Sequence, residues 1–242
     1  MVDLQTDEEK AEAIKKWWKE NGIAVISGVA IGLAAIYGWR AWTNYQEQIG
    51  QQASLAFEEL LVTVSQAAVV PPPTPSDQAD ADEDADAADA DSGVDANPLI
   101  TLATEQQARL SDEYSSTPYA FFGQLAVAKA QVDQGEAEAA AEILRSAMQQ
   151  APTPLLKTLA GLRLARVLIA TQEYDAAKDV IKRYDGDQSY AADFAALRGD
   201  IALAEQRIED ARTAYEQALA GNAAAAQLIR LKLQDLPAPA DS

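Results

Sequence analysis

The side chains that could do chemistry in this chain are carboxylates, because the sequence contains neither histidine nor cysteine. Histidine is the commonest general base and metal ligand, and cysteine supplies thiolates and disulfides. Glu58 with Glu59 and Glu209 with Asp210 are adjacent carboxylates that could form an acid–base pair. Neighbours on a helix point about 100° apart, so each pair is better explained as solvated surface. The composition therefore predicts a protein that is not an enzyme.

Aspartates stand at alternate positions from Asp80 to Asp86, as in a calcium-binding loop. An EF-hand loop starting at Asp80 would need Gly at its sixth position and Glu at its twelfth, where this chain has Ala85 and Asp91. The surrounding residues 71–98 are rich in Pro and Asp and have little apolar surface to bury, which predicts a disordered insertion. We predict no metal site and no cofactor. The net charge of −19 also argues against a nucleic-acid partner.

The longest uncharged stretch runs from Gly22 to Trp39. As a helix it spans roughly 27 Å, close to the roughly 30 Å hydrocarbon core of a bilayer. Its apolar residues surround the whole helix, which favours a membrane span over a buried helix of a soluble domain, because the latter would keep a polar stripe. We predict a transmembrane helix over residues 21–42. Ala24, Gly28 and Gly32 recur every four positions, a spacing that lets a second membrane helix pack closely.

The basic residues around this span predict its orientation. Lys10, Lys15, Lys16 and Lys19 precede the span, whereas Arg40 is the only basic residue after it before Arg109. Basic flanks are retained in the cytoplasm. Residues 1–20 are therefore predicted to be a cytoplasmic segment, with the bulk of the chain beyond the membrane.

The rest of the chain predicts helices that repeat. Residues 46–70 form a first soluble helix by their apolar stripe, and residues 99–236 form a helical-repeat domain followed by a tail over 237–242. Ala140, Ala177 and Ala211 occupy one position of the pattern, thirty-seven and then thirty-four residues apart. Thirty-four residues is the tetratricopeptide period, in which each helix pair packs on the next. Gln172 and Gln206 stand near the turn where Gly is usual.

The predicted fold is thus all-α, with a single N-terminal transmembrane helix followed by a tetratricopeptide-like solenoid. The first soluble helix and residues 99–113 are expected to make a degenerate pair around the insertion. Residues 222–236 are expected to cap the last repeat through Leu228, Ile229, Leu231 and Leu233. The sequence Arg198–Gly199–Asp200 matches an adhesion tripeptide. Gly199, however, falls where the helices of a repeat approach each other, so we expect Gly199 to serve helix packing.

Several segments, in this order and spacing, resemble the YfgM family: Trp17–Gly22 with the lysines before it, the Gly-rich span, Gly38–Arg40, Ala53–Phe57, Leu162–Leu168 and Leu197–Asp200. The resemblance covers nearly the whole chain except the Pro- and Asp-rich insertion. It implies a single-pass protein of the bacterial inner membrane with its bulk in the periplasm. It also implies an adaptor or chaperone role with three kinds of partner: SecYEG-type translocon subunits, the membrane-anchored chaperone PpiD, and emerging secreted clients. A scaffold of another envelope assembly, in division or secretion machinery, is the alternative.

Helical repeats usually bind through the surface lined by the first helix of each pair. The repeat register carried over from the family places a candidate partner-binding face on twelve residues: Phe122, Leu125, Lys129, Val132, Leu159, Leu162, Arg166, Ile169, Asp193, Ala196, Asp200 and Leu203. The apolar members would hold a client segment, and Lys129 and Arg166 would meet acidic groups or a terminal carboxylate. Core packing is the competing explanation for the Leu and Phe positions.

Overall fold

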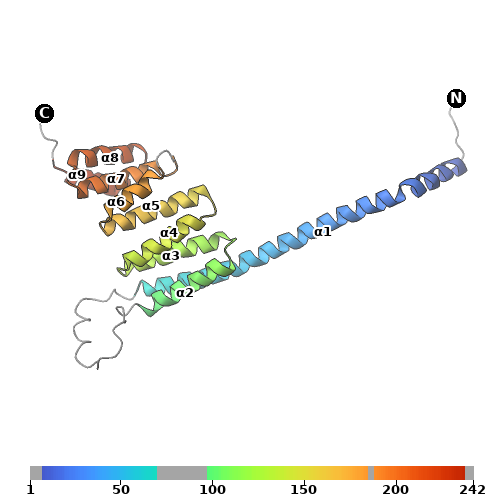
Figure 1. The fold of residues 1–242 in the computed structure, drawn as a ribbon, viewed down its shortest axis with the longest axis horizontal. Coiled ribbons are helices and arrows are strands. Elements are labelled where there is room, and N and C mark those ends of the chain that lie inside the picture. Colours follow the sequence, from blue (N-terminus) through green and yellow to red (C-terminus); the bar gives the residue numbers. More distant parts are fainter. Residues whose placement is uncertain (1–6, 70–96, 185–187, 238–242) are drawn as a thin grey trace, which may run out of the picture. The chain divides into compact units, whose positions relative to one another are not determined.

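The computed structural model describes residues 7–69, 97–184 and 188–237. These residues form helices and no strand, as predicted for an all-α chain (Figure 1). The predicted insertion lies almost wholly outside the described residues, and its disorder stays a prediction. The helices are α1 (Asp7–Ala67), α2 (Pro98–Glu113), α3 (Pro118–Asp133), α4 (Ala137–Gln150), α5 (Pro154–Ala170), α6 (Tyr174–Lys182), α7 (Ala191–Ala204), α8 (Ile208–Ala220) and α9 (Ala226–Asp235).

Helix α1 is continuous from Asp7 to Ala67, so the expected span and the first soluble helix belong to one element. The chain divides into two compact units, residues 1–52 and 53–242, and each is described by itself. In the first unit the large apolar side chains lie on the surface, and Ile23 and Ile31 are 86% and 70% exposed. Among the described residues, α1 is the one helix long and apolar enough to cross a membrane, with a mean hydropathy of 1.8 in its most apolar window.

The second unit begins with the end of α1 packed on α2. Leu60 and Leu110, which are 0% and 1% exposed, share a core cluster with Ala103 and Val127. A hydrogen bond from the Gln106 Nε2 to the Glu59 Oε1, 3.0 Å long, joins the same two helices. The degenerate first pair predicted on either side of the insertion is therefore formed.

The predicted repeat register is confirmed by the burial of its small residues. Ala140, Ala177 and Ala211 lie in α4, α6 and α8, and all three are 0% exposed. Each second helix thus brings its backbone against the first helix of the pair, where a larger side chain would hold the two apart. The pairs are α3 with α4, α5 with α6 and α7 with α8.

Gly199 is required by close packing, as expected from its place in the repeat. A Cβ built on it would lie 2.5 Å from Cε1 of Tyr215, a ring that is itself 0% exposed. The tripeptide Arg198–Asp200 sits within α7, so Gly199 belongs to the interface between α7 and α8. The resemblance to an adhesion motif has no structural counterpart.

The turns that end the first helix of each pair share one backbone geometry. Gly135, Gln172 and Gln206 adopt positive φ angles of 86°, 64° and 61°. At each turn the next backbone N–H donates to the carbonyl five residues earlier, as from Glu173 to Leu168 and from Arg207 to Ala202, both 2.8 Å. This is the Schellman helix end, which favours Gly because a Cβ crowds the left-handed backbone. The two glutamines therefore keep the turn at a conformational cost.

Replacing Gln172 or Gln206 with glycine is expected to raise the free energy of unfolding by about 1 kcal/mol each, because the left-handed conformation no longer strains a Cβ. Urea unfolding of the full chain in mild detergent, followed by circular dichroism, measures the effect. Gln217→Gly is the matched control, because Gln217 lies within α8 and should lose about 0.5–1 kcal/mol. A destabilisation by Gln172→Gly comparable with the control would contradict the turn assignment.

The C-terminal helix α9 covers the last repeat with a narrower face than expected. Ile229 is 2% exposed and Leu233 packs against the same cluster, as predicted. The prediction for Leu228 and Leu231 is wrong, because they are 53% and 54% exposed. Residues 229 and 233 are one turn apart and face the core, whereas 228 and 231 share the opposite edge of the helix.

Candidate functional site

Two clefts lie along the first helices of the repeats. The first has a volume of about 290 Å³ and is bounded by α3, α4 and α5. It is lined by Leu125, Ala128, Lys129, Val132, Leu144, Arg163, Arg166 and Val167. Its floor is aliphatic, and its charged groups are all cations.

The second cleft has a volume of about 550 Å³ and lies between α5, α7, α9 and the segment leading into α9. Apolar side chains such as Ile169, Leu197 and Leu228 alternate there with charged ones. Two ion pairs cross it: Arg166 to Asp193 at 3.7 Å and Lys232 to Asp200 at 2.6 Å. Arg166 lines both clefts, so they adjoin at this residue.

Most of the residues expected on the partner-binding face line these clefts. Eight of them do so: Leu125, Lys129, Val132, Arg166, Ile169, Asp193, Ala196 and Asp200. Phe122 and Leu203 lie outside both clefts on the surface, where they are 40% and 37% exposed, and Leu159 is half-buried beside the main core. The placement of Leu162 on the binding face is wrong. Its side chain is 2% exposed because the packed repeat helices enclose it.

Asp200 is already engaged by two donors within the fold. The Tyr215 hydroxyl donates to its Oδ1 at 2.7 Å, and the Lys232 Nζ donates to the same oxygen at 2.6 Å. Burial, followed by the bond to Asp200, raises the pKa of Tyr215, so this hydroxyl stays protonated and donating. The role expected of Asp200 in partner binding therefore competes with an internal role, tying α7 to α8 and α9.

Three cleft residues were not among those predicted from the sequence: Arg163, Leu228 and Lys232. Arg163 stands one helical turn before Arg166, and that spacing is a signal that could have revealed it. Leu228 and Lys232 come from α9, and no local pattern shows that this helix reaches the second cleft. Their contribution depends on how the C-terminal helix packs.

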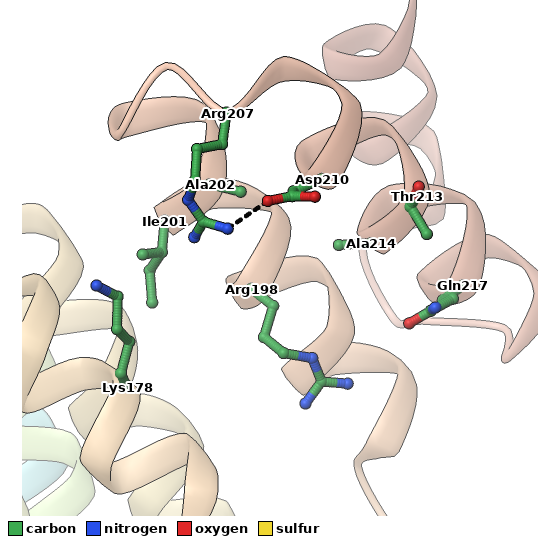
Figure 2. A pocket seen from close by; sticks show the side chains of 9 residues that line it. All are labelled: Lys178, Arg198, Ile201, Ala202, Arg207, Asp210, Thr213, Ala214 and Gln217. Atoms are coloured by element: carbon green, nitrogen blue, oxygen red, sulfur yellow. Dashed lines mark hydrogen bonds and ion pairs between the residues drawn. The ribbon is translucent and has the colours of Figure 1, made fainter.

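A third pocket, of about 350 Å³, lies between α6, α7 and α8. Figure 2 shows Lys178, Arg198 and Arg207 around it, with the Arg207 guanidinium directed at Asp210. Glu205 accepts hydrogen bonds from both Lys178 and Arg207, which lower the pKa of its carboxyl and raise the pKa of each cation. The charges of Lys178 and Arg207 are thus matched by carboxylates within the fold.

The described residues contain no cluster of three or more acidic side chains placed to hold a metal ion. The aspartates at 80–86 lie outside the described residues. In the first unit, Ala24, Gly28 and Gly32 are exposed on α1, and a Cβ built on either glycine would meet nothing within 4 Å. Their role in packing against another membrane helix stays a prediction.

Comparison with known proteins agrees with this architecture. The family model described as tetratricopeptide repeat-like domain matches residues 15–238. The chain is 27% identical to an ancillary SecYEG translocon subunit of Escherichia coli (strain K12), with 98% of this chain and 99% of the relative covered. A protein of the same name in Haemophilus influenzae is 29% identical, with 95% and 97% covered. No solved structure shows a significant match.

These matches extend over nearly the full length of the chain, from the apolar N-terminal helix to the C-terminal one. The likeness thus covers both the apolar helix and the repeat domain of this chain rather than one segment. The resemblance to the YfgM family is confirmed by these full-length relatives. The chain belongs to the tetratricopeptide repeat-like family, and relatives that it resembles over nearly their full length are named ancillary SecYEG translocon subunits.

Proposed function

We propose that this protein is a non-enzymatic adaptor or chaperone of the Sec translocon, held in the bacterial inner membrane by α1. Its partners are translocon subunits, a PpiD-type membrane-anchored chaperone and secreted proteins as they emerge. The observation that carries the proposal is the pair of clefts that meet at Arg166 on the first helices of the repeats. The name shared by the full-length relatives points to the translocon as the place of action.

The proposed orientation has the N-terminus in the cytoplasm and the repeat domain in the periplasm. Its support is the difference in basic residues on the two sides of the apolar stretch, with four lysines before it and Arg40 after it. In this orientation the repeat domain meets polypeptides as they leave the channel.

The clefts suit a polypeptide better than a small metabolite. Aliphatic side chains such as Val132, Ile169 and Leu228 line them, and the charged groups lie among these side chains rather than gathered at one point. Such a surface holds apolar side chains of a segment while charges align its polar groups. A tightly converging set of polar groups, as an enzyme site would need, is not found along these two clefts.

Photo-crosslinking amino acids at Val132 and Leu228 are expected to capture translocon subunits or secreted chains in intact cells. Both side chains are exposed, at 41% and 53%, and line the two clefts. Gln149, an exposed residue of α4 outside both clefts, is the control and should yield several-fold less product. Mass spectrometry of the products identifies the partners.

Two results would oppose this proposal. Equal labelling at Val132, Leu228 and Gln149 would show that the clefts are not the binding surface. Products made up of division or secretion machinery, without translocon subunits, would favour the alternative of a scaffold in another envelope assembly.

A further inference from the structure

Arg163 differs from the other cations that line the first and second clefts and the third pocket. Its side chain is half-buried on α5 and lines the first cleft, yet it makes no ion pair or hydrogen bond with any described residue. The other guanidinium nearby is that of Arg166, one turn along the helix. Burial, and then the charge of Arg166, lower the pKa of Arg163, whereas Tyr190 raises it. A half-buried guanidinium of this kind can gain a charge-assisted hydrogen bond from an anion that enters the cleft.

The other cations of these two clefts and of the third pocket have partners. Lys129 pairs with Asp133 and Arg166 with Asp193. In the third pocket, Lys178 and Arg207 share Glu205, and Figure 2 shows Arg207 turned toward Asp210. The first cleft has three cations and no carboxylate among its lining residues, and two of these cations pair with carboxylates outside that lining. Arg163 is the one cation of this cleft with no carboxylate partner among the described residues.

The walls of the cleft restrict the anion it can take. Leu125 and Val167 line the floor, and Val132 is 41% exposed at the side. A volume of about 290 Å³ has room for a few side chains rather than for a large ligand. A free phosphate would leave this apolar surface uncovered, whereas a carboxylate beside an aliphatic side chain would satisfy both parts.

We propose that the first cleft binds a segment of a partner polypeptide through a side-chain carboxylate seated at Arg163 and Arg166, with a neighbouring aliphatic side chain against the exposed side chain of Val132. This inference rests on the proposed function and names the chemistry that the cleft selects. The carboxylate belongs to the interior of a segment rather than to a chain end, because the cleft continues past Arg166 into the second cleft.

Two blocked pentapeptides test this proposal, one with glutamate between two leucines and a twin with glutamine in its place. The full chain in an uncharged detergent is titrated with each peptide, and the arginine Nε–Hε signals are followed by NMR. The glutamate peptide is expected to bind about 10-fold more tightly, since a charge-assisted bond to a guanidinium is roughly twice as strong as a neutral one. Arg163→Gln should abolish the difference between the twins.

Arg145→Gln is the matched control, because it removes the same charge from α4 outside both clefts and should keep the preference. Urea unfolding checks the fold of Arg163→Gln. We expect it to be at least as stable as the wild type, because the substitution removes a half-buried charge that has no carboxylate partner among the described residues.

Equal binding of the two peptides would overturn the proposal, and so would a preference that survives Arg163→Gln. Tighter binding of inorganic phosphate, or of phosphatidylglycerol added to the detergent, would overturn it in favour of a phosphate or lipid ligand. The proposed function would survive each of these results as long as Val132 and Leu228 still crosslink to translocon subunits. Loss of those crosslinks together with a retained peptide preference would instead refute the translocon role alone.

Discussion

A variant with aspartate at both Val29 and Ile31 is expected to disappear from the membrane fraction. These residues lie near the middle of the uncharged stretch, and their side chains are 58% and 70% exposed on α1. An aspartate at the centre of a membrane helix costs about 2.5–3.5 kcal/mol, so the pair costs about 5–7 kcal/mol. Fractionation of cells, followed by immunoblotting, measures how the protein divides between membrane and soluble fractions.

Spheroplasts treated with external protease test the proposed orientation in the same cells. The wild-type repeat domain should be cleaved because it is on the outside, whereas the double variant should stay in the cytoplasm and be protected. Aspartates at Gln46 and Gln48, beyond the predicted span on the same helix, are the control and should leave both results unchanged. A repeat domain protected in wild-type spheroplasts would contradict the orientation, and a double variant still in the membrane would contradict the anchor.

Gly199→Ala is expected to lower the free energy of unfolding by about 2–3 kcal/mol, because it overpacks a closed interface. The new Cβ would lie 2.5 Å from Cε1 and 2.6 Å from Cδ1 of Tyr215, well inside contact distance. The ring has no free direction in which to move. It is 0% exposed, and its hydroxyl is bonded to Asp200. Urea unfolding of the full chain in mild detergent, followed by circular dichroism, gives the change.

The same substitution at Gly50 is the matched control, since a Cβ there meets nothing within 4 Å and α1 should gain slightly from alanine. Adding Tyr215→Leu to Gly199→Ala tests the cause of the loss. A smaller side chain should relieve the clash, so the double variant should lose less than the sum of the two single variants. Strict additivity would show that the Tyr215 ring is not what excludes the Cβ.

The predictions that succeeded from the sequence rest on local patterns. The apolar stretch from Gly22 to Trp39 predicted a transmembrane helix, and the described residues have one helix there that is long and apolar enough to cross a membrane. The repeated alanines Ala140, Ala177 and Ala211 predicted the helix pairs, since small residues recur wherever backbones must approach. The packing role of Gly199 was predicted from the same repeat register.

The structure corrected the predictions that needed to know which neighbour covers a face. Leu162 and Arg166 stand one turn apart on α5, yet Leu162 is buried and Arg166 reaches both clefts. Leu228 and Leu231 look as apolar as Ile229 and Leu233 in the sequence, but α9 turns them to the surface. Periodicity shows that two residues share a side of a helix, but not what lies against that side.

The sequence by itself determined the element types, the repeat register and the anchoring stretch, because these depend on residues close together along the chain. Only the tertiary structure decided that α9 helps to line the second cleft and that Arg166 joins the two clefts. It also decided that Arg163 has no carboxylate beside it among the described residues, whereas its neighbour Arg166 has Asp193. The physical reason is that ion pairs and burial depend on distances between side chains of different helices. These distances are set by the packing of the helices.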